Sequence, residues 1–61
     1  MNKQDIRVTR TLQLIRSAFL SLLEEKGFDA ITVQDILERT QINRSTFYKH
    51  FKNKNEMALK L

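Results

Sequence analysis

The stretch INRSTFYKHF, residues 42–51, decides the fold because its two faces differ so sharply. At about 100° per residue, Phe47 and Phe51 are i,i+4 neighbours that point together toward a core. Ser45 and Lys49 have the same spacing on the opposite side of the helix. Three further polar side chains surround that outer side: Arg44, Thr46 and Tyr48. The outer side is therefore rich in hydroxyl groups and positive charge.

DNA is the partner that such a helix suits best. The major groove admits an α-helix, and Arg or Lys side chains bond guanine there. Hydroxyl groups and Tyr bond phosphate oxygens, which holds a protein in register on the duplex. We therefore predict that a helix over residues 44–51 reads the major groove.

The segment ITVQDI is typical of a helix start and lies shortly before this helix. Thr32 as N-cap and Asp35 three residues later resemble a capping box, and Ile31 with Ile36 can form a hydrophobic staple. In the same way, Asn43 can cap the helix that follows it. Only two or three residues separate the two helices, so the chain must turn sharply, as in a helix-turn-helix.

Further helices are predicted on both sides of this pair. Apolar residues recur at helical spacing between residues 12 and 23. Gly27 stands where a left-handed residue would end that helix, with Phe28 folding back on Leu23. In NKNEM, Asn53 is a cap for a fourth helix, and Glu56 follows three residues later.

The sequence therefore predicts an all-α fold. Residues 9–53 form a three-helix, homeodomain-like helix-turn-helix domain for DNA binding, and residues 54–61 start a fourth helix. No Gly, cap or polar tail ends that helix before Leu61, so we expect it to continue in a longer chain. Residues 1–8 have weak hydrophobic periodicity and are predicted to be a flexible arm.

Composition narrows the function classes for these 61 residues, which suffice for one small domain. With no Cys and one His, neither a metal site nor a cofactor is expected, and an enzyme is disfavoured because no acid–base constellation is present. No apolar run reaches the roughly 18 residues of a membrane span, and the charged start lacks a signal core. A cytoplasmic protein is the expectation.

Net charge is +4, and its distribution matters more than its total. Residues 1–23 carry four Lys or Arg against one Asp, and residues 43–61 carry five against one Glu. Residues 24–42 carry two Lys or Arg against five acidic residues. A polyanion would meet the basic ends. Two other partners stay open: an acidic protein docked by a small basic helical module, and, less favoured, a membrane surface.

The segment ITVQDILERTQINRSTFYKHFKNKNEM resembles the N-terminal DNA-binding domain of TetR-type transcriptional regulators, with TFYKHFKNK as its most specific piece. The resemblance extends from about Thr9 to Leu61. It implies a repressor that binds double-stranded DNA at a quasi-palindromic operator. It also implies that residues 54–61 start a linker helix to a C-terminal domain missing from this sequence. That domain would form the homodimer and bind the small-molecule effector that releases the repressor.

The resemblance also implies a set of DNA contacts. Tyr48 matches a phosphate-binding tyrosine, and Lys54 matches a lysine that opens the fourth helix against phosphate. Gln34 matches a position that reaches a base. The predicted DNA-binding residues are Thr32, Gln34, Arg44, Ser45, Thr46, Tyr48, Lys49, His50 and Lys54.

One departure from the family pattern lies in the turn between the second and third helices. The family usually has a small residue and then Gly there, whereas this chain has Thr40 and Gln41. A Gln with positive φ bears a steric cost that Gly does not. The sequence pattern therefore does not determine the angle between the second and third helices.

Overall fold

The computed structural model describes the backbone of residues 3–61 and the side chains from Val8 onward. Over residues 3–61 the chain is entirely helical, which confirms the predicted all-α class. None of the helices in that range is long and apolar enough to cross a membrane. The elements are α1 (Lys3–Lys26), the 3-10 turn η1 (Phe28–Ala30), α2 (Val33–Thr40), α3 (Arg44–His50) and α4 (Lys54–Lys60).

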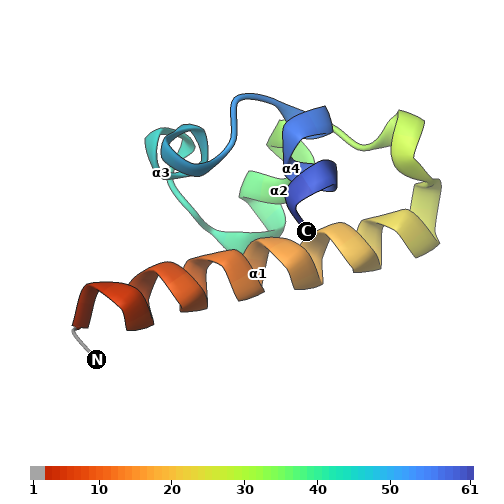
Figure 1. Ribbon diagram of the computed structural model, residues 1–61. Helices are drawn as coiled ribbons and strands as arrows, with labels where there is room; N and C mark the ends of the chain where they lie inside the picture. Colours follow the sequence, from red (N-terminus) through yellow and green to blue (C-terminus); the bar gives the residue numbers. More distant parts are fainter. Residues whose placement is uncertain (1–2) are drawn as a thin grey trace.

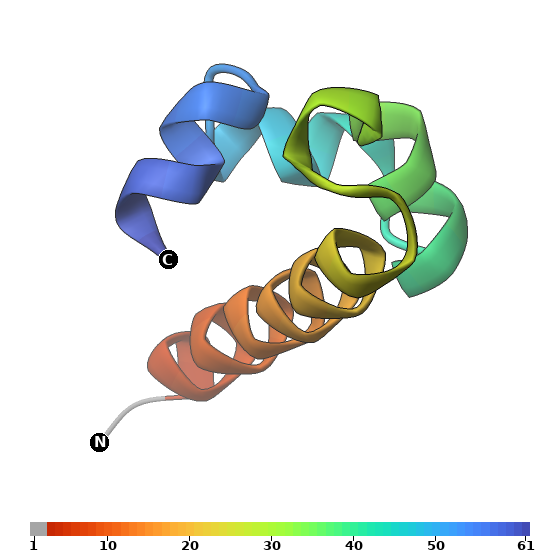
Figure 2. The same ribbon diagram turned by 90° about the vertical axis from the view of Figure 1, so that its right-hand side faces the viewer.

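The long helix α1 lies along one side of the molecule, and the three short helices lie together on its other side (Figures 1 and 2). Both α2 and α4 begin on the side away from α1 and run toward it. The reading helix α3 also lies on that far side. The first turns of α2 and α4 and the whole of α3 therefore share one side of the fold.

Helix α1 begins within the segment predicted to be an arm. Residues 3–8, predicted to be a flexible arm, form the first turns of this helix. Residues 1 and 2 of that arm lie outside the described residues. Neither Gly nor Pro interrupts the first 26 residues, and each residue added to an existing helix gains one backbone hydrogen bond. Weak amphipathicity alone therefore does not end the helix.

The core draws side chains from every helix, because each short helix has one apolar face to bury. Phe47 of α3 and Phe51, which follows α3, are 0% and 3% exposed, with ring centroids 5.6 Å apart. Their burial fixes which side of α3 faces outward. The buried side chains are Ile15, Ala18, Phe19, Leu22, Ile31, Ile36, Leu37, Phe47, Phe51 and Met57.

Helix α1 ends at a glycine with positive φ, but this glycine is not in the left-handed helical region. Gly27 has φ 78° and ψ 162°, a region that residues with a Cβ rarely adopt. The chain therefore runs on into η1 instead of closing the predicted left-handed cap. Phe28 packs edge-on against Phe19, with ring centroids 6.2 Å apart. This contact draws η1 onto α1.

Two of the three predicted caps are confirmed. The Thr32 hydroxyl accepts a hydrogen bond from the Asp35 amide, and the Asp35 carboxylate accepts one from the Thr32 amide, both at 3.0 Å. The Asn53 side chain accepts from the Glu56 amide at 2.8 Å. Asn43 occupies the N-cap position of α3, but its side chain makes no capping bond to any residue that the structure describes.

Candidate nucleic-acid interface

The turn between α2 and α3 is left-handed at Gln41, despite the absence of Gly. Gln41 has φ 62° and ψ 23°, and its amide donates to the Leu37 carbonyl at 2.8 Å. Its side chain donates to the Glu38 carbonyl at 2.9 Å. The Thr40 hydroxyl accepts from the Ile42 amide at 3.3 Å. These bonds offset the cost of about 1–2 kcal/mol of a left-handed L-residue, so the sharp turn is kept.

The outer side of α3 carries the predicted reading residues. Arg44, Ser45 and Lys49 are exposed, and so is Tyr48 at 46%. The Tyr48 ring packs edge-on against the buried ring of Phe47, with centroids 5.3 Å apart. This contact holds the tyrosine in place. Thr46 and His50 are half-buried at the edges of the same side.

A side-chain bond joins α2 to α3 at this surface. Arg44 Nη2 donates to Gln34 Oε1 at 2.5 Å. Gln34 lies in the first turn of α2, and Arg44 is the first residue of α3. The structure therefore brings together two predicted base-contacting residues that are ten positions apart in the chain.

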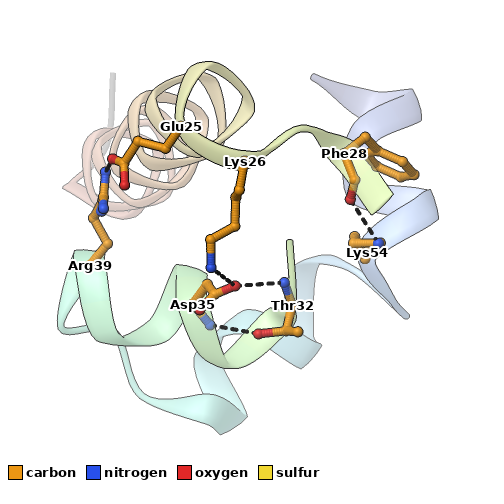
Figure 3. Close-up of polar contacts among 7 residues, drawn as sticks. All are labelled: Glu25, Lys26, Phe28, Thr32, Asp35, Arg39 and Lys54. Atoms are coloured by element: carbon orange, nitrogen blue, oxygen red, sulfur yellow. Dashed lines mark hydrogen bonds and ion pairs between the residues drawn. The ribbon is translucent and has the colours of Figure 1, made fainter. Parts of the chain in front are cut away.

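The start of α2 already holds a negative charge. The Lys26 ammonium donates to Asp35 Oδ2 at 3.2 Å, beside the capping bonds with Thr32 (Figure 3). The hydrogen bond from the Thr32 backbone amide, followed by that from Lys26, lowers the pKa of the Asp35 carboxyl. A phosphate that contacts DNA-binding candidate Thr32 at this helix end would therefore meet the negative charge of Asp35.

The start of α4 is tied to η1 by Lys54. The Lys54 ammonium donates to the Phe28 carbonyl at 2.9 Å and lies 4.4 Å from the centroid of the Phe28 ring (Figure 3). The sequence predicted only a phosphate contact for Lys54 and not these two contacts with Phe28, which together are called the clasp. An ammonium group has three donors, and this bond uses one.

A second ion pair joins α1 to α2, besides that of Lys26 and Asp35. Arg39 donates to the Glu25 carboxylate (Figure 3). It also donates to the Ser21 hydroxyl at 2.7 Å. The Arg39 hydrogen bond lowers the pKa of Glu25, and the same bond raises the pKa of Arg39. The pair of Glu25 and Arg39 therefore joins α1 to α2.

An exposed cationic helix, set by a left-handed turn against a second capped helix, defines a helix-turn-helix DNA-binding domain. The profile of the family described as bacterial regulatory proteins, tetR family, matches residues 15–61. The chain belongs to this family and is a DNA-binding domain of a transcription regulator.

Several of its relatives are named as HTH-type transcriptional regulators or activators. The uncharacterized regulator YxbF of Bacillus subtilis (strain 168) is 44% identical over 54 residues, which is 87% of this chain and 14% of YxbF. TcmR of Streptomyces glaucescens is 39% identical over 59 residues, or 97% of this chain and 25% of TcmR. DhaS of Lactococcus lactis subsp. lactis (strain IL1403), the dhaKLM operon transcriptional activator, is 36% identical over 47 residues. These are 77% of this chain and 25% of DhaS.

The chain thus spans a quarter or less of each of these relatives. No solved structure matches the chain.

Proposed function

We propose that the chain binds double-stranded DNA by placing α3 in the major groove. The outer side of α3, opposite the buried Phe47 and Phe51, carries this proposal. Its exposed side chains include donors for guanine and for phosphate oxygens. The first turns of α2 and α4 lie on the same side and flank the groove. The proposed contacts are Thr32, Gln34, Arg44, Ser45, Thr46, Tyr48, Lys49, His50 and Lys54.

For the whole regulator, we propose a homodimer that binds a quasi-palindromic operator and represses until a small-molecule effector binds. Two copies of α3 would then lie about 34–36 Å apart, one turn of the duplex. DNA would weaken effector binding by the factor by which effector weakens DNA binding. The relative DhaS is named an activator, so similar domains also serve activation. Equal operator binding with and without every candidate effector would contradict effector release.

The DNA interface is tested by fluorescence anisotropy of a labelled duplex across a salt series. The chain is compared with a variant in which Arg44, Tyr48 and Lys49 are all changed to Ala. The control changes Arg10 and Arg16 to Ala, which removes the same charge from exposed positions of α1. Circular dichroism verifies that all three proteins are helical.

We expect log affinity to fall linearly with log salt, with a slope of about −0.9 per phosphate contacted. The α3 variant should lose most binding, and the α1 control should keep it. Equal weakening of both variants would mean a diffuse charge effect and would remove α3 as the reader. Absence of binding by the chain and by the complete regulator at low salt would favour an acidic protein partner.

A further inference from the structure

Two residues that resemblance treats as separate DNA contacts are bound to each other in this structure. The bond between Arg44 Nη2 and Gln34 Oε1 is short, at 2.5 Å, and spans the α2–α3 turn. Both residues are exposed, and both are among the proposed DNA contacts. A bond between two such side chains limits what each can offer a base pair.

The chemistry of the two groups defines the arrangement. A guanidinium has five N–H donors and no acceptor, so the Gln34 amide must present its oxygen to Arg44. The amide NH₂ group then points away from Arg44. Four guanidinium donors stay available on Arg44, enough for both acceptors of a guanine edge, O6 and N7.

Gln34 is correspondingly less suited to read a base by itself. A glutamine reads adenine with its oxygen and its NH₂ group together, accepting from N6 and donating to N7. In this structure the Arg44 guanidinium lies at that oxygen. The pairing thus favours guanine recognition by Arg44 over adenine recognition by Gln34.

The backbone around the pair keeps it in register. Arg44 opens α3 and Gln34 lies in the first turn of α2, so neither side chain sits on a long loop. The turn between them is held at Gln41 by the bonds to Leu37 and Glu38. The relative position of the two side chains is therefore set by the turn.

The surface beside the pair suits an uncharged base edge. Gln34 and Arg44 line an open hollow of about 460 Å³, whose wall also includes Glu38. Glu38 is exposed, and its negative charge repels a phosphate group, whereas a carboxylate can accept a hydrogen bond from a cytosine amino group. A guanine–cytosine pair satisfies both the guanidinium and this acidic wall.

We propose that Gln34 and Arg44 act as one guanine-reading unit, in which Arg44 bonds the base and Gln34 is the positioning residue. This inference rests on the proposed DNA interface. It predicts a single guanine preference that depends on both residues, because a guanidinium held in place loses less conformational freedom on binding.

The test starts with selection of duplexes from a randomised pool by the chain at low salt, followed by sequencing. The guanine that Arg44→Ala ceases to select is then replaced by 7-deazaguanine, which lacks the N7 acceptor. Affinities for both duplexes are measured for the chain, Arg44→Ala, Gln34→Met, Gln34→Glu and the double variant Gln34→Met with Arg44→Ala. Gln13→Met, an exposed glutamine on α1, is the matched control.

We expect a guanine preference of about tenfold or more for the unchanged chain, abolished in Arg44→Ala. Gln34→Met should weaken the same preference by about fivefold, the factor of one hydrogen bond. The double variant should equal Arg44→Ala. Gln34→Glu keeps the acceptor oxygen, so it should retain the preference while it lowers affinity for all sequences alike.

Two results would overturn the proposal that Gln34 and Arg44 act as one unit. If Gln34→Met changes the base preference at a different position, and the losses in the double variant are additive, the two residues read bases independently. Binding through α3 with no base preference would also overturn it, yet leave the interface intact. Failure of the interface itself is a separate result, seen as equal weakening of the α3 and α1 variants in the salt series.

Discussion

The clasp between Lys54 and η1 allows a sharp test of the fold, by the change Lys54→Met. Met keeps much of the side-chain packing but removes the charged donor. A hydrogen bond from a charged group contributes about 1.5–3 kcal/mol, and a cation–π contact at an exposed site about 0.5–1 kcal/mol. Because the ammonium bonds Phe28 at 2.9 Å but is only half-buried, we take the lower ends together, about 2 kcal/mol.

A loss of this size is large for this chain. A core of this length supplies only about 3–5 kcal/mol, and each 1 kcal/mol shifts the midpoint of a small domain by about 4–8 °C. We therefore expect Lys54→Met to lower the thermal midpoint by about 8–16 °C. The assay is thermal and urea unfolding followed by circular dichroism.

The matched control is Lys52→Met, which removes an equal charge from an exposed lysine two residues earlier. Lys54→Arg retains a charged donor and should lose less than Lys54→Met. If the free energies of unfolding of Lys54→Met and Lys52→Met differ by less than about 0.5 kcal/mol, the contacts of Lys54 with Phe28 do not stabilise the fold, and the reasoning is refuted. A salt slope reduced by about 0.9 in Lys54→Met would be separate support for a phosphate contact.

Three further perturbations test the core, the turn and the cap. Phe47→Ala should cost about 3–5 kcal/mol, comparable to the whole stability, so its circular dichroism should show an unfolded chain at 25 °C. Gln41→Val should destabilise by on the order of 1 kcal/mol in urea unfolding, because a β-branched residue resists φ 62°, whereas Gln41→Asn should be tolerated. The pKa of Asp35 is lowered below its ordinary 3.8 in the folded chain, so its contribution is present above that pH and lost as pH falls through the folded-state pKa. Acid titration of Asp35→Asn should therefore show a weaker loss of stability below about pH 4 than the unchanged chain, and an identical acid profile would contradict the capping account.

Much of the fold follows from short-range patterns. The buried positions of Phe47 and Phe51 follow from their i,i+4 spacing, and the capping box follows from Thr32 and Asp35 three residues apart. The start of α1 at Lys3 did not follow, because propagation of a helix does not require an amphipathic pattern. Local steric arguments identified the cost at Gln41, but the bonds that offset it appear only in the folded turn.

The sequence by itself determined the caps at Thr32 and Asn53, which face of each helix is apolar, and that the reading helix is cationic. Such features depend on residues within about one helical turn of each other. Only the tertiary structure decided that Arg44 bonds Gln34, ten residues away, and that Lys54 bonds Phe28, 26 residues away. These contacts depend on the angles between helices. The left-handed turn at Gln41 and the shared core set those angles, and residue spacing alone does not encode them.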